Sequence, residues 1–387
     1  MLFFQVVLNS SLLNYYSYTI SQIVYENIII FLKLRYKDYS SNFLILHQSL
    51  KIYKSFGLYI FIKMKHKITF YIILGALLLG TFSCTKKENL ESKIITPTFT
   101  RTINNKELRF ENNRITELTK DDNNEAVYGV ISDIHGEVNK ARFIAEELKK
   151  RNVEGIIVTG DIPKNEILRY DKNDSKEDKQ EIIDSLEAVA ESNLPVFVIP
   201  GNHESKSDYE SALRILSERH SNIIDMTKYR IFDGDDVDFV SLPGYQDKRF
   251  VSSNGYYASP DEINNLGNLR NGLSDSVVLI THGAGKTNSI NGPASLYDGK
   301  DVGDSLTSEV QQKYNIPFAL VGHIHEAAGH AATFNGIEVK QNEFSSQFTA
   351  NFGTLEKWEN IDGNTYNATV GIFTIKGNLA KYEMIYL

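Results

Sequence analysis

From about residue 126 onward, short apolar runs of the chain alternate with longer segments in which apolar residues recur every three or four positions. The short runs are typical of buried strands, and the longer spacing is typical of helices with one apolar face. The alternation predicts parallel strands with helices packed on the faces of the sheet. The predicted strands are "AVYGVIS" (126–132), "VEGIIVTG" (153–160) and "LPVFVIPG" (194–201), and the predicted helices are 137–151, 179–193 and 207–220.

Beyond residue 228 the pattern changes to shorter, strand-rich pieces. We expect these to form a mixed sheet, or two sheets packed face to face with helices outside, so that residues 126–387 make one α/β domain. Residues 84–125 are polar and predict a tether followed by one or two peripheral strands. The strand-rich pieces are "YRIFD" (229–233), "VDFVSLPG" (237–244), "SVVLITHG" (276–283), "PFALVGHIHE" (317–326), "GIEVKQ" (336–341), "ATVGIFTIKG" (368–377) and "AKYEMIYL" (380–387).

The first 83 residues differ in kind from the rest of the chain. They hold 9 of the 21 Tyr and 8 of the 21 Phe but only two acidic residues, Glu26 and Asp38. Within them, Met64 is followed by a basic start and the apolar run "ITFYIILGALLLG", the layout of a secretory signal peptide over 64–83. A buried hydrophobic helix is the alternative interpretation. If Met64 is the true start, residues 1–63 are an upstream extension outside the native protein.

Cys84 is the single cysteine of the chain and directly follows this segment. Its placement resembles a bacterial lipoprotein signal, in which the cysteine becomes the lipidated first residue, although Thr81 stands where such signals usually carry Leu. The resemblance implies a protein of the cell envelope, anchored through Cys84 to a bacterial membrane and facing away from the cytoplasm. A buried free thiol is the alternative, and a single cysteine excludes an internal disulfide.

The charge balance narrows the class of partner. The full chain has a formal net charge of −8, and without residues 1–83 the value is −14, because that segment holds eight Lys and Arg but only two Asp and Glu. An acidic body lacks the basic surface that binds a phosphate backbone, so we do not expect nucleic acid as a partner. The content of 42% hydrophobic and 23% charged residues is ordinary for a globular protein.

Residues suited to metal binding follow five of the predicted strands, at the point where each strand ends. Functional groups in open α/β sheets gather at the carboxyl ends of the strands, so we expect these residues to meet. Five of the nine His of the chain occupy these places. Each of these places, taken alone, is also explained as a turn, a capped loop or exposed strand residues. Such explanations do not account for all five places together. The residues are Asp133, His135, Asp161, Asn202, His203, His282, His323 and His325.

The side chains of Asp, Asn and His offer oxygen and imidazole ligands without a thiolate. Such a set suits Mn²⁺, Fe²⁺ or Zn²⁺ better than Ca²⁺. Apart from His203, these residues are two Asp, one Asn and four His. Seven ligands exceed the number that one tetrahedral zinc uses and suffice for two ions if one carboxylate bridges them. A two-metal site is suited to in-line displacement at phosphorus. The sequence therefore predicts two divalent metal ions and a small phosphorylated substrate.

The ordered series "SDIHG", "TGD", "PGNHE", "THG" and "GHIH" resembles the calcineurin-like metallophosphoesterase family over residues 126–387. The resemblance implies an α/β fold of the metallophosphatase type, a four-layer sandwich of two mixed β-sheets flanked by α-helices. It also implies hydrolysis of a phosphate mono- or diester by attack of a metal-bound hydroxide. His203 would not be a ligand, but would protonate the leaving oxygen or stabilise the charge on phosphorus. In this scheme one ion is held by Asp133, His135 and His325, the other by Asn202, His282 and His323, and Asp161 bridges them.

Three other functions compete with this hypothesis. Protein serine/threonine phosphatases of this superfamily carry an Arg in "GDxxDRG", whereas this chain has "GDIPKNEI" at 160–167, which weakens that assignment. A non-catalytic binding or scaffold protein on the same fold should lack some ligands or His203, and here all are present. A zinc peptidase would need an "HExxH" helix, a motif that the sequence does not contain.

Overall fold

The computed structural model describes residues 98–164 and 175–387. These residues belong to one compact unit, Ile94–Leu387. The predicted upstream extension, the signal peptide and Cys84 lie outside the described residues. Within the described part, no helix is both long enough and apolar enough to cross a membrane.

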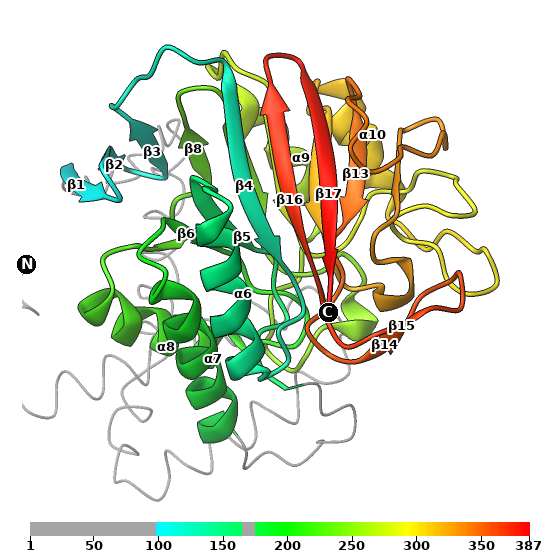
Figure 1. The fold of residues 1–387 in the computed structure, drawn as a ribbon, viewed down its shortest axis with the longest axis horizontal. Helices are drawn as coiled ribbons and strands as arrows, with labels where there is room; N and C mark the ends of the chain where they lie inside the picture. The colour runs from blue at the N-terminus through cyan, green and yellow to red at the C-terminus, as the bar shows by residue number, and fades with distance from the viewer. Residues whose placement is uncertain (1–97, 165–174) are drawn as a thin grey trace, which may run out of the picture. The chain divides into compact units, whose positions relative to one another are not determined.

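The first of two large sheets is mixed and has six strands (Figure 1). Four neighbouring strands, β4 to β7, run parallel, and β16 and β17 continue the sheet on the other side of β4 in antiparallel pairing. The last two strands of the chain thus complete the sheet that the first predicted strands begin. The strand order is β17 (Leu379–Tyr386), β16 (Thr369–Lys376), β4 (Glu125–Ile131), β5 (Gly155–Val158), β6 (Val196–Val198) and β7 (Ile223–Asp225).

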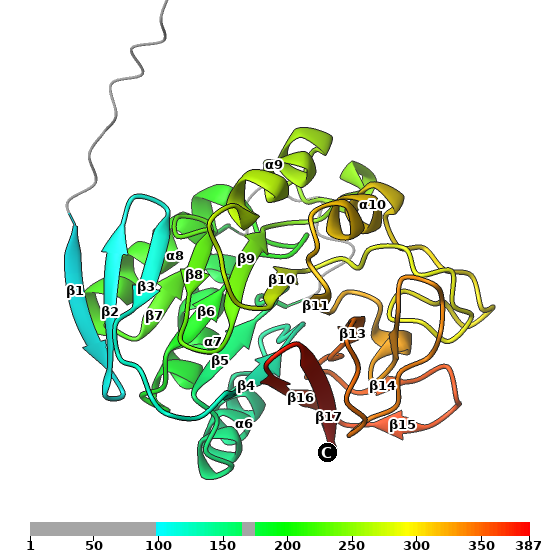
Figure 2. The ribbon, with the colours of Figure 1, turned by 90° about the horizontal axis from the view of Figure 1, so that it is seen from above.

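The second sheet is also mixed and has nine strands. Its central strands β9, β10, β11 and β13 pair in parallel, and β1 to β3 lie at one edge (Figure 2). A separate hairpin pairs β14 (Trp358–Glu359) with β15 (Thr365–Tyr366). The strand order is β1 (Phe99–Ile103), β2 (Lys106–Glu111), β3 (Arg114–Glu117), β8 (Ile231–Asp233), β9 (Asp238–Leu242), β10 (Val277–Thr281), β11 (Phe318–Val321), β13 (Phe348–Asn351) and β12 (Ala331–Ala332).

Helices cover the outer face of each sheet. The apolar faces of α6 (Val138–Lys150), α7 (Ser175–Ala190) and α8 (Lys206–Arg219) pack on the six-stranded sheet in one core cluster. The helices α9 (Pro260–Arg270) and α10 (Ser305–Lys313) pack on the nine-stranded sheet in another. Side chains at the N-caps of α8, α9 and α10 accept backbone N–H groups that would otherwise be unpaired. Two short 3₁₀ turns lie at Lys248–Phe250 (η1) and His325–Ala327 (η2).

The core between the two sheets is rich in aromatic rings. Alternate residues of each central strand face opposite ways: Val278 and Ile280 of β10 point to the inner core, whereas Val277 and Leu279 pack against the helices outside. Strands buried on both faces explain why the sequence shows continuous apolar runs rather than alternation. Helices, sheet, sheet and helices make four layers, so the predicted four-layer α/β sandwich is confirmed.

Some elements differ from the sequence prediction. The predicted strand 336–341 is a turn with a single isolated bridge at Glu338, because Gly336 adopts a positive φ of 77°. The strand β13 was not predicted, since its four residues, "FTAN", give no alternation to recognise. The strands β1 to β3 contribute Ile103, Leu108, Phe110 and Ile115 to the core between the sheets.

We expect Phe239→Leu to lower the free energy of unfolding by about 1–2 kcal/mol. The ring of Phe239 is fully buried and lies 4.8 Å from Tyr128, 5.6 Å from Phe197 and 5.4 Å from Phe232, centroid to centroid. Phe143→Leu on α6 is the matched control, because its side chain is 52% exposed, and its change should stay within about 0.5 kcal/mol. Urea unfolding measures both values, and equal values would contradict this packing.

Candidate metal centre

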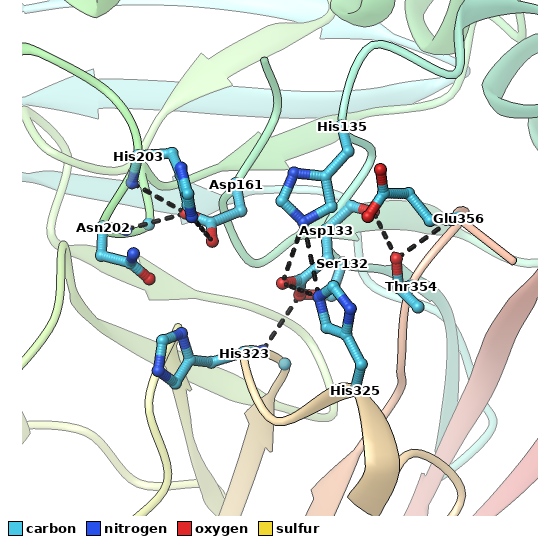
Figure 3. A network of polar contacts seen from close by, with 12 residues as sticks. Ser132, Asp133, His135, Asp161, Asn202, His203, His323, His325, Thr354 and Glu356 are labelled. Atoms are coloured by element: carbon cyan, nitrogen blue, oxygen red, sulfur yellow. Dashed lines mark hydrogen bonds and ion pairs between the residues drawn. The ribbon is translucent and has the colours of Figure 1, made fainter. Parts of the chain in front are cut away.

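The loops that follow β4, β5, β6, β10 and β11 meet at one place, and Figure 3 shows polar side chains of the loops after β4, β5, β6 and β11 facing one another. Backbone hydrogen bonds join the loops. The N–H of Asp133 donates to the carbonyl of Gly160 over 3.0 Å, and that of His135 donates to the carbonyl of Asp161 over 3.1 Å. From the second sheet, the N–H of His323 donates to Oδ2 of Asp133 over 3.0 Å. The structure thus brings all eight residues singled out in the sequence into one cluster.

Asp133, His135 and His325 form the first group of possible metal ligands. One ligand atom of each lies within 4.8 Å of the others. Oδ1 of Asp133 is 3.0 Å from Nε2 of His325 and 3.7 Å from Nε2 of His135, and the two nitrogens are 3.4 Å apart. Ligands bound at about 2.1 Å in a tetrahedron lie about 3.4 Å apart, so these spacings fit a single ion.

Asp161, His282 and His323 form the second group. Nε2 of His282 lies 3.1 Å from Oδ2 of Asp161 and 3.2 Å from Nδ1 of His323. Asn202 adds its side-chain oxygen, 2.9 Å from the same nitrogen. The Nδ2 of Asn202 donates to the carbonyl of Phe250 over 3.0 Å, which turns the amide oxygen toward the group. Four possible ligand atoms therefore converge here.

Hydrogen bonds to the backbone decide which ring nitrogen faces each group. Nδ1 of His135 lies 3.2 Å from the carbonyl of Pro163. Nδ1 of His282 lies 3.0 Å from the carbonyl of Thr159. Because a carbonyl only accepts, each Nδ1 carries the hydrogen, and Nε2 of the neutral ring presents a lone pair. Nitrogen and oxygen lone pairs thus converge on two points, an arrangement that fits divalent ions of the Mn²⁺, Fe²⁺ or Zn²⁺ type.

Without an ion, protons supply the positive charge. Burial lowers the pKa of His135, but the hydrogen bond to Asp133 and its charge outweigh burial and raise the pKa to about 9. Burial likewise opposes charging of His282, whose pKa the carboxylates of Asp161 and Asp133 raise to about 9. Burial and the charge of His282 lower the pKa of His323 to about 3. Burial acts to raise the pKa of the carboxyls of Asp133 and Asp161. The neighbouring imidazoles nevertheless hold the pKa of each well below its usual range. An ion that enters must displace these protons.

Four of the possible ligands have left-handed backbone conformations. Thirteen non-glycine residues of the described chain have a positive φ, and nine of them are Asn, which tolerates that region. The other four all belong to the two ligand groups. Each costs roughly 1–2 kcal/mol, strain that is typical of functional sites. They are Asp133 (φ 49°), His135 (48°), Asp161 (51°) and His323 (68°).

Two glycines allow the loops to approach this closely. A Cβ on Gly201 would collide with the carboxylate of Asp161. A Cβ on Gly322 would collide with the side chains of Ser132 and Asp133. Neither glycine needs a left-handed φ, so lack of space, not backbone conformation, requires glycine at both positions.

His203 lies beside the two groups rather than within either. Its Nε2 is 3.5 Å from Oδ2 of Asp161, and its ring meets that of His135 edge-on at 5.5 Å. Burial lowers the pKa of His203, and the charge of Asp161 opposes this shift. The side chain is 26% exposed, whereas that of His282 is fully buried. His203 can therefore contact a substrate bound at the ligand groups.

Glu204 holds two of the loops together rather than facing the ligand groups. Its Oε1 accepts the N–H of Ile162 and its Oε2 accepts the N–H of Gly201, each over 2.8 Å. The side chain is buried, and burial together with the charge of Asp161 raises its pKa to about 7. Glu204 thus fixes the loop after β5 to the loop after β6.

Sequence analysis missed two positioning residues at the same edge of the sheet: Asn351, the last residue of β13, and Thr354, which follows the strand. Nδ2 of Asn351 donates to the carbonyls of Gly322 and Ile324, each over 3.0 Å, and so holds the loop that carries His323. The hydroxyl of Thr354 donates to the carbonyl of Asp133 over 3.0 Å. The available signal was "NFGT" (351–354), which combines Asn, Gly and Thr as the other strand ends do, but no apolar run precedes it.

Known proteins resemble this chain in sequence or in fold. A family model described as calcineurin-like phosphoesterase matches residues 127–327, more than half of the chain. A search of curated proteins found no match. Similar solved structures include TT1561 of Thermus thermophilus (10% identity, 62% of this chain and 98% of that chain, TM-score 0.43), a dimetal phosphatase from Danio rerio (12%, 67% and 98%, 0.40) and phosphopantetheinyl hydrolase from Mycobacterium tuberculosis (17%, 60% and 90%, 0.39).

The match includes all eight clustered residues, from Asp133 to His325. It confirms the sequence-based prediction of a hydrolase that acts on phosphoric ester bonds. The chain therefore belongs to the calcineurin-like phosphoesterase family.

Proposed function

We propose that the protein is a dinuclear metal-dependent phosphoesterase that hydrolyses a phosphate mono- or diester of a small molecule. The observation that carries the proposal is the presence of two adjacent ligand groups of Asp and His. The hydrogen bond from the N–H of His323 to Asp133 joins a member of the second group to a member of the first over 3.0 Å. Adjacent groups favour two ions that act on one phosphate.

Asp161 is the residue best suited to bridge the two ions. Its Oδ1 accepts the N–H groups of Asn202 and His203 over 2.8 and 3.0 Å, which fixes the carboxylate. Its Oδ2 lies 3.1 Å from the imidazole of His282 in the second group. Its charge also raises the pKa of His135 in the first group. One carboxylate thus acts on both groups, as a bridging ligand must.

Two bound divalent ions would neutralise the phosphate oxygens and supply the nucleophile. Residues of the protein orient the phosphate and the nucleophile and transfer the proton. Asn202 presents only its oxygen to the second group, because Phe250 holds its Nδ2. His203 lies at the exposed side of the cluster, where it protonates the leaving oxygen or stabilises charge on phosphorus.

We expect activity to depend on about two ions per chain. A chelator should abolish hydrolysis of 4-nitrophenyl phosphate and bis(4-nitrophenyl) phosphate, and Mn²⁺, Fe²⁺ or Zn²⁺ should restore it. Elemental analysis should find fewer ions in Asp161→Asn, because the bridge loses its charge. Asp261→Asn, at an exposed position of α9, is the matched control with full metal content. One ion in the unaltered chain, or full metal content in Asp161→Asn, would contradict the dinuclear assignment.

We expect His203→Ala to slow esters with poor leaving groups more than esters with good ones. An alkoxide must be protonated as it leaves, whereas 4-nitrophenolate leaves as the anion. The loss in kcat should be about 100-fold or more for an alkyl phosphate and below about 10-fold for a 4-nitrophenyl ester.

The matched control for this experiment is His220→Ala. His220 pairs with Glu187 over 3.0 Å on the helical layer and should leave both rates unchanged when replaced. Equal losses for both esters in His203→Ala would favour charge stabilisation over proton transfer. No loss for either would exclude a catalytic role for His203.

We also propose that Cys84 is lipidated and holds the enzyme on a bacterial membrane, facing away from the cytoplasm. The order of Met64, the apolar run and Cys84 in the sequence supports this. In a bacterial host fed radioactive palmitate, the unaltered chain should carry label and Cys84→Ala should not. Ser83→Ala is the neighbouring control and should remain labelled. An unlabelled native chain, or equal labelling of Cys84→Ala, would refute the anchor.

A further inference from the structure

We infer that the site prefers phosphate esters whose retained organic group ends in an aromatic ring. The inference rests on the proposed function and adds a class of substrate to it. Its basis is a pocket of about 1000 Å³ whose lining begins at His323 of the second ligand group. This volume suits an organic group of the size of a nucleoside. Three aromatic residues, Tyr245, Phe250 and Tyr257, contribute to its wall.

The aromatic rings lead outward from the metal centre. The ring of Tyr245 lies 4.0 Å from the imidazole of His323 and 6.3 Å from the ring of Phe250, which it meets edge-on. Tyr245 is 8% exposed, whereas Phe250 is 58% and Tyr257 38% exposed. Aromatic rings pair favourably with other rings in stacked or edge-on geometry. Two exposed rings in a pocket wall therefore offer stacking surface to a flat ligand.

Hydrogen bonds hold this aromatic segment, residues 244–257, against the loop after β6. The N–H of Gly244 donates to the carbonyl of Pro200, and the N–H of Ser252 donates to the carbonyl of Asn202, each over 2.9 Å. The residues Tyr245 and Tyr257 are joined by a backbone bridge. The wall is therefore formed before a ligand arrives, which lowers the entropy cost of binding.

The charged residues of the pocket favour an anionic ligand. The carboxylate of Asp247 pairs with Arg249, with Oδ2 2.5 Å from Nη2. That of Asp304 caps α10 by accepting the N–H of Thr307 over 2.7 Å. The lysines Lys248 and Lys300 have no ion-pair partner within residues 98–164 and 175–387. Three cationic side chains and two carboxylates line the pocket, so it keeps a net positive charge.

The remaining wall is apolar apart from Gln246, Gly303 and Ser305, so the pocket combines ring surface, apolar surface and positive charge. A phosphate ester that carries an aromatic group matches all three, whereas an alkyl ester matches only two. Among the described lining residues, His203 is absent, so the group in this pocket is the one that stays on phosphorus. The apolar lining residues are Ala284, Ala294, Leu296, Val302 and Ile324.

The test uses three diesters that share 4-nitrophenol as leaving group and differ in the retained group: methyl, octyl and 2-phenylethyl. Because the leaving group is constant, the ratios of kcat/KM measure how well the pocket binds each retained group. We expect kcat/KM for the 2-phenylethyl diester to exceed that for the methyl diester by about 30-fold. It should also exceed that for the octyl diester by about 5-fold, although the octyl group has at least as much apolar surface. Thymidine 5′-(4-nitrophenyl phosphate) should also exceed methyl.

A variant of Phe250 connects this preference to the pocket. Phe250→Ala removes the exposed ring but keeps the backbone carbonyl that holds Asn202. The ratio of kcat/KM for 2-phenylethyl to that for methyl should fall about 5-fold. Phe344→Ala is the matched control, since Phe344 is 44% exposed, packs with Lys381 and does not line the pocket, and it should keep the ratio.

The outcomes separate this inference from the proposed function. Hydrolysis of all three diesters at equal kcat/KM, or a preference for octyl, overturns the inference and leaves the function intact. No hydrolysis of any phosphate ester with any of the metals overturns the function. If only monoesters are hydrolysed, 2-phenylethylphosphonate and octylphosphonate serve as competitive inhibitors of 4-nitrophenyl phosphate hydrolysis. An inhibition constant no lower for 2-phenylethylphosphonate then overturns the inference.

Discussion

The arrangement of the site depends on one buried carboxylate, that of Asp161. Its Oδ1 accepts the N–H groups of Asn202 and His203, and its backbone carbonyl accepts the N–H of His135. Its Oδ2 faces His282 from the other sheet. Loops after three strands of one sheet and one strand of the other thus meet at a single residue. Because Gly201 has no Cβ, the loop after β6 can lie directly against this carboxylate.

This concentration of charge opposes folding. Carboxylates and imidazoles with almost no exposure are costly unless paired, and four of the ligand candidates add backbone strain. Mutual pairing of the groups offsets part of the cost, as the low pKa of Asp133 and the pKa of about 9 at His282 indicate. The aromatic core between the sheets and the helical layers outside supply the stability that the site itself lacks.

The sequence was sufficient to predict the layers and to locate the clustered residues, because each lies where an apolar run ends. It did not reveal Asn351, since the strand β13 that ends with this residue is four residues long and lacks a recognisable period. It also gave Ile337 the appearance of a strand residue, although Gly336 turns the chain there. The pocket was beyond prediction, because the ring of Tyr245 meets that of His323 through a contact between loops far apart in the sequence. Local pattern indicates elements, whereas such contacts depend on how the sheets pack.

Phe250 also connects the chemistry of the site to its selectivity. Its backbone carbonyl holds the amide of Asn202, a possible metal ligand, and its ring lines the pocket. A ligand that moved this segment would therefore disturb the second ligand group, and a ligand that fits it would keep Asn202 in place. Side chains of the segment can vary without this cost, since the hydrogen bond uses only the main chain. Such a division allows the same metal centre to act on esters with different organic groups. The backbone preserves the geometry for hydrolysis, and the side chains determine which ester binds.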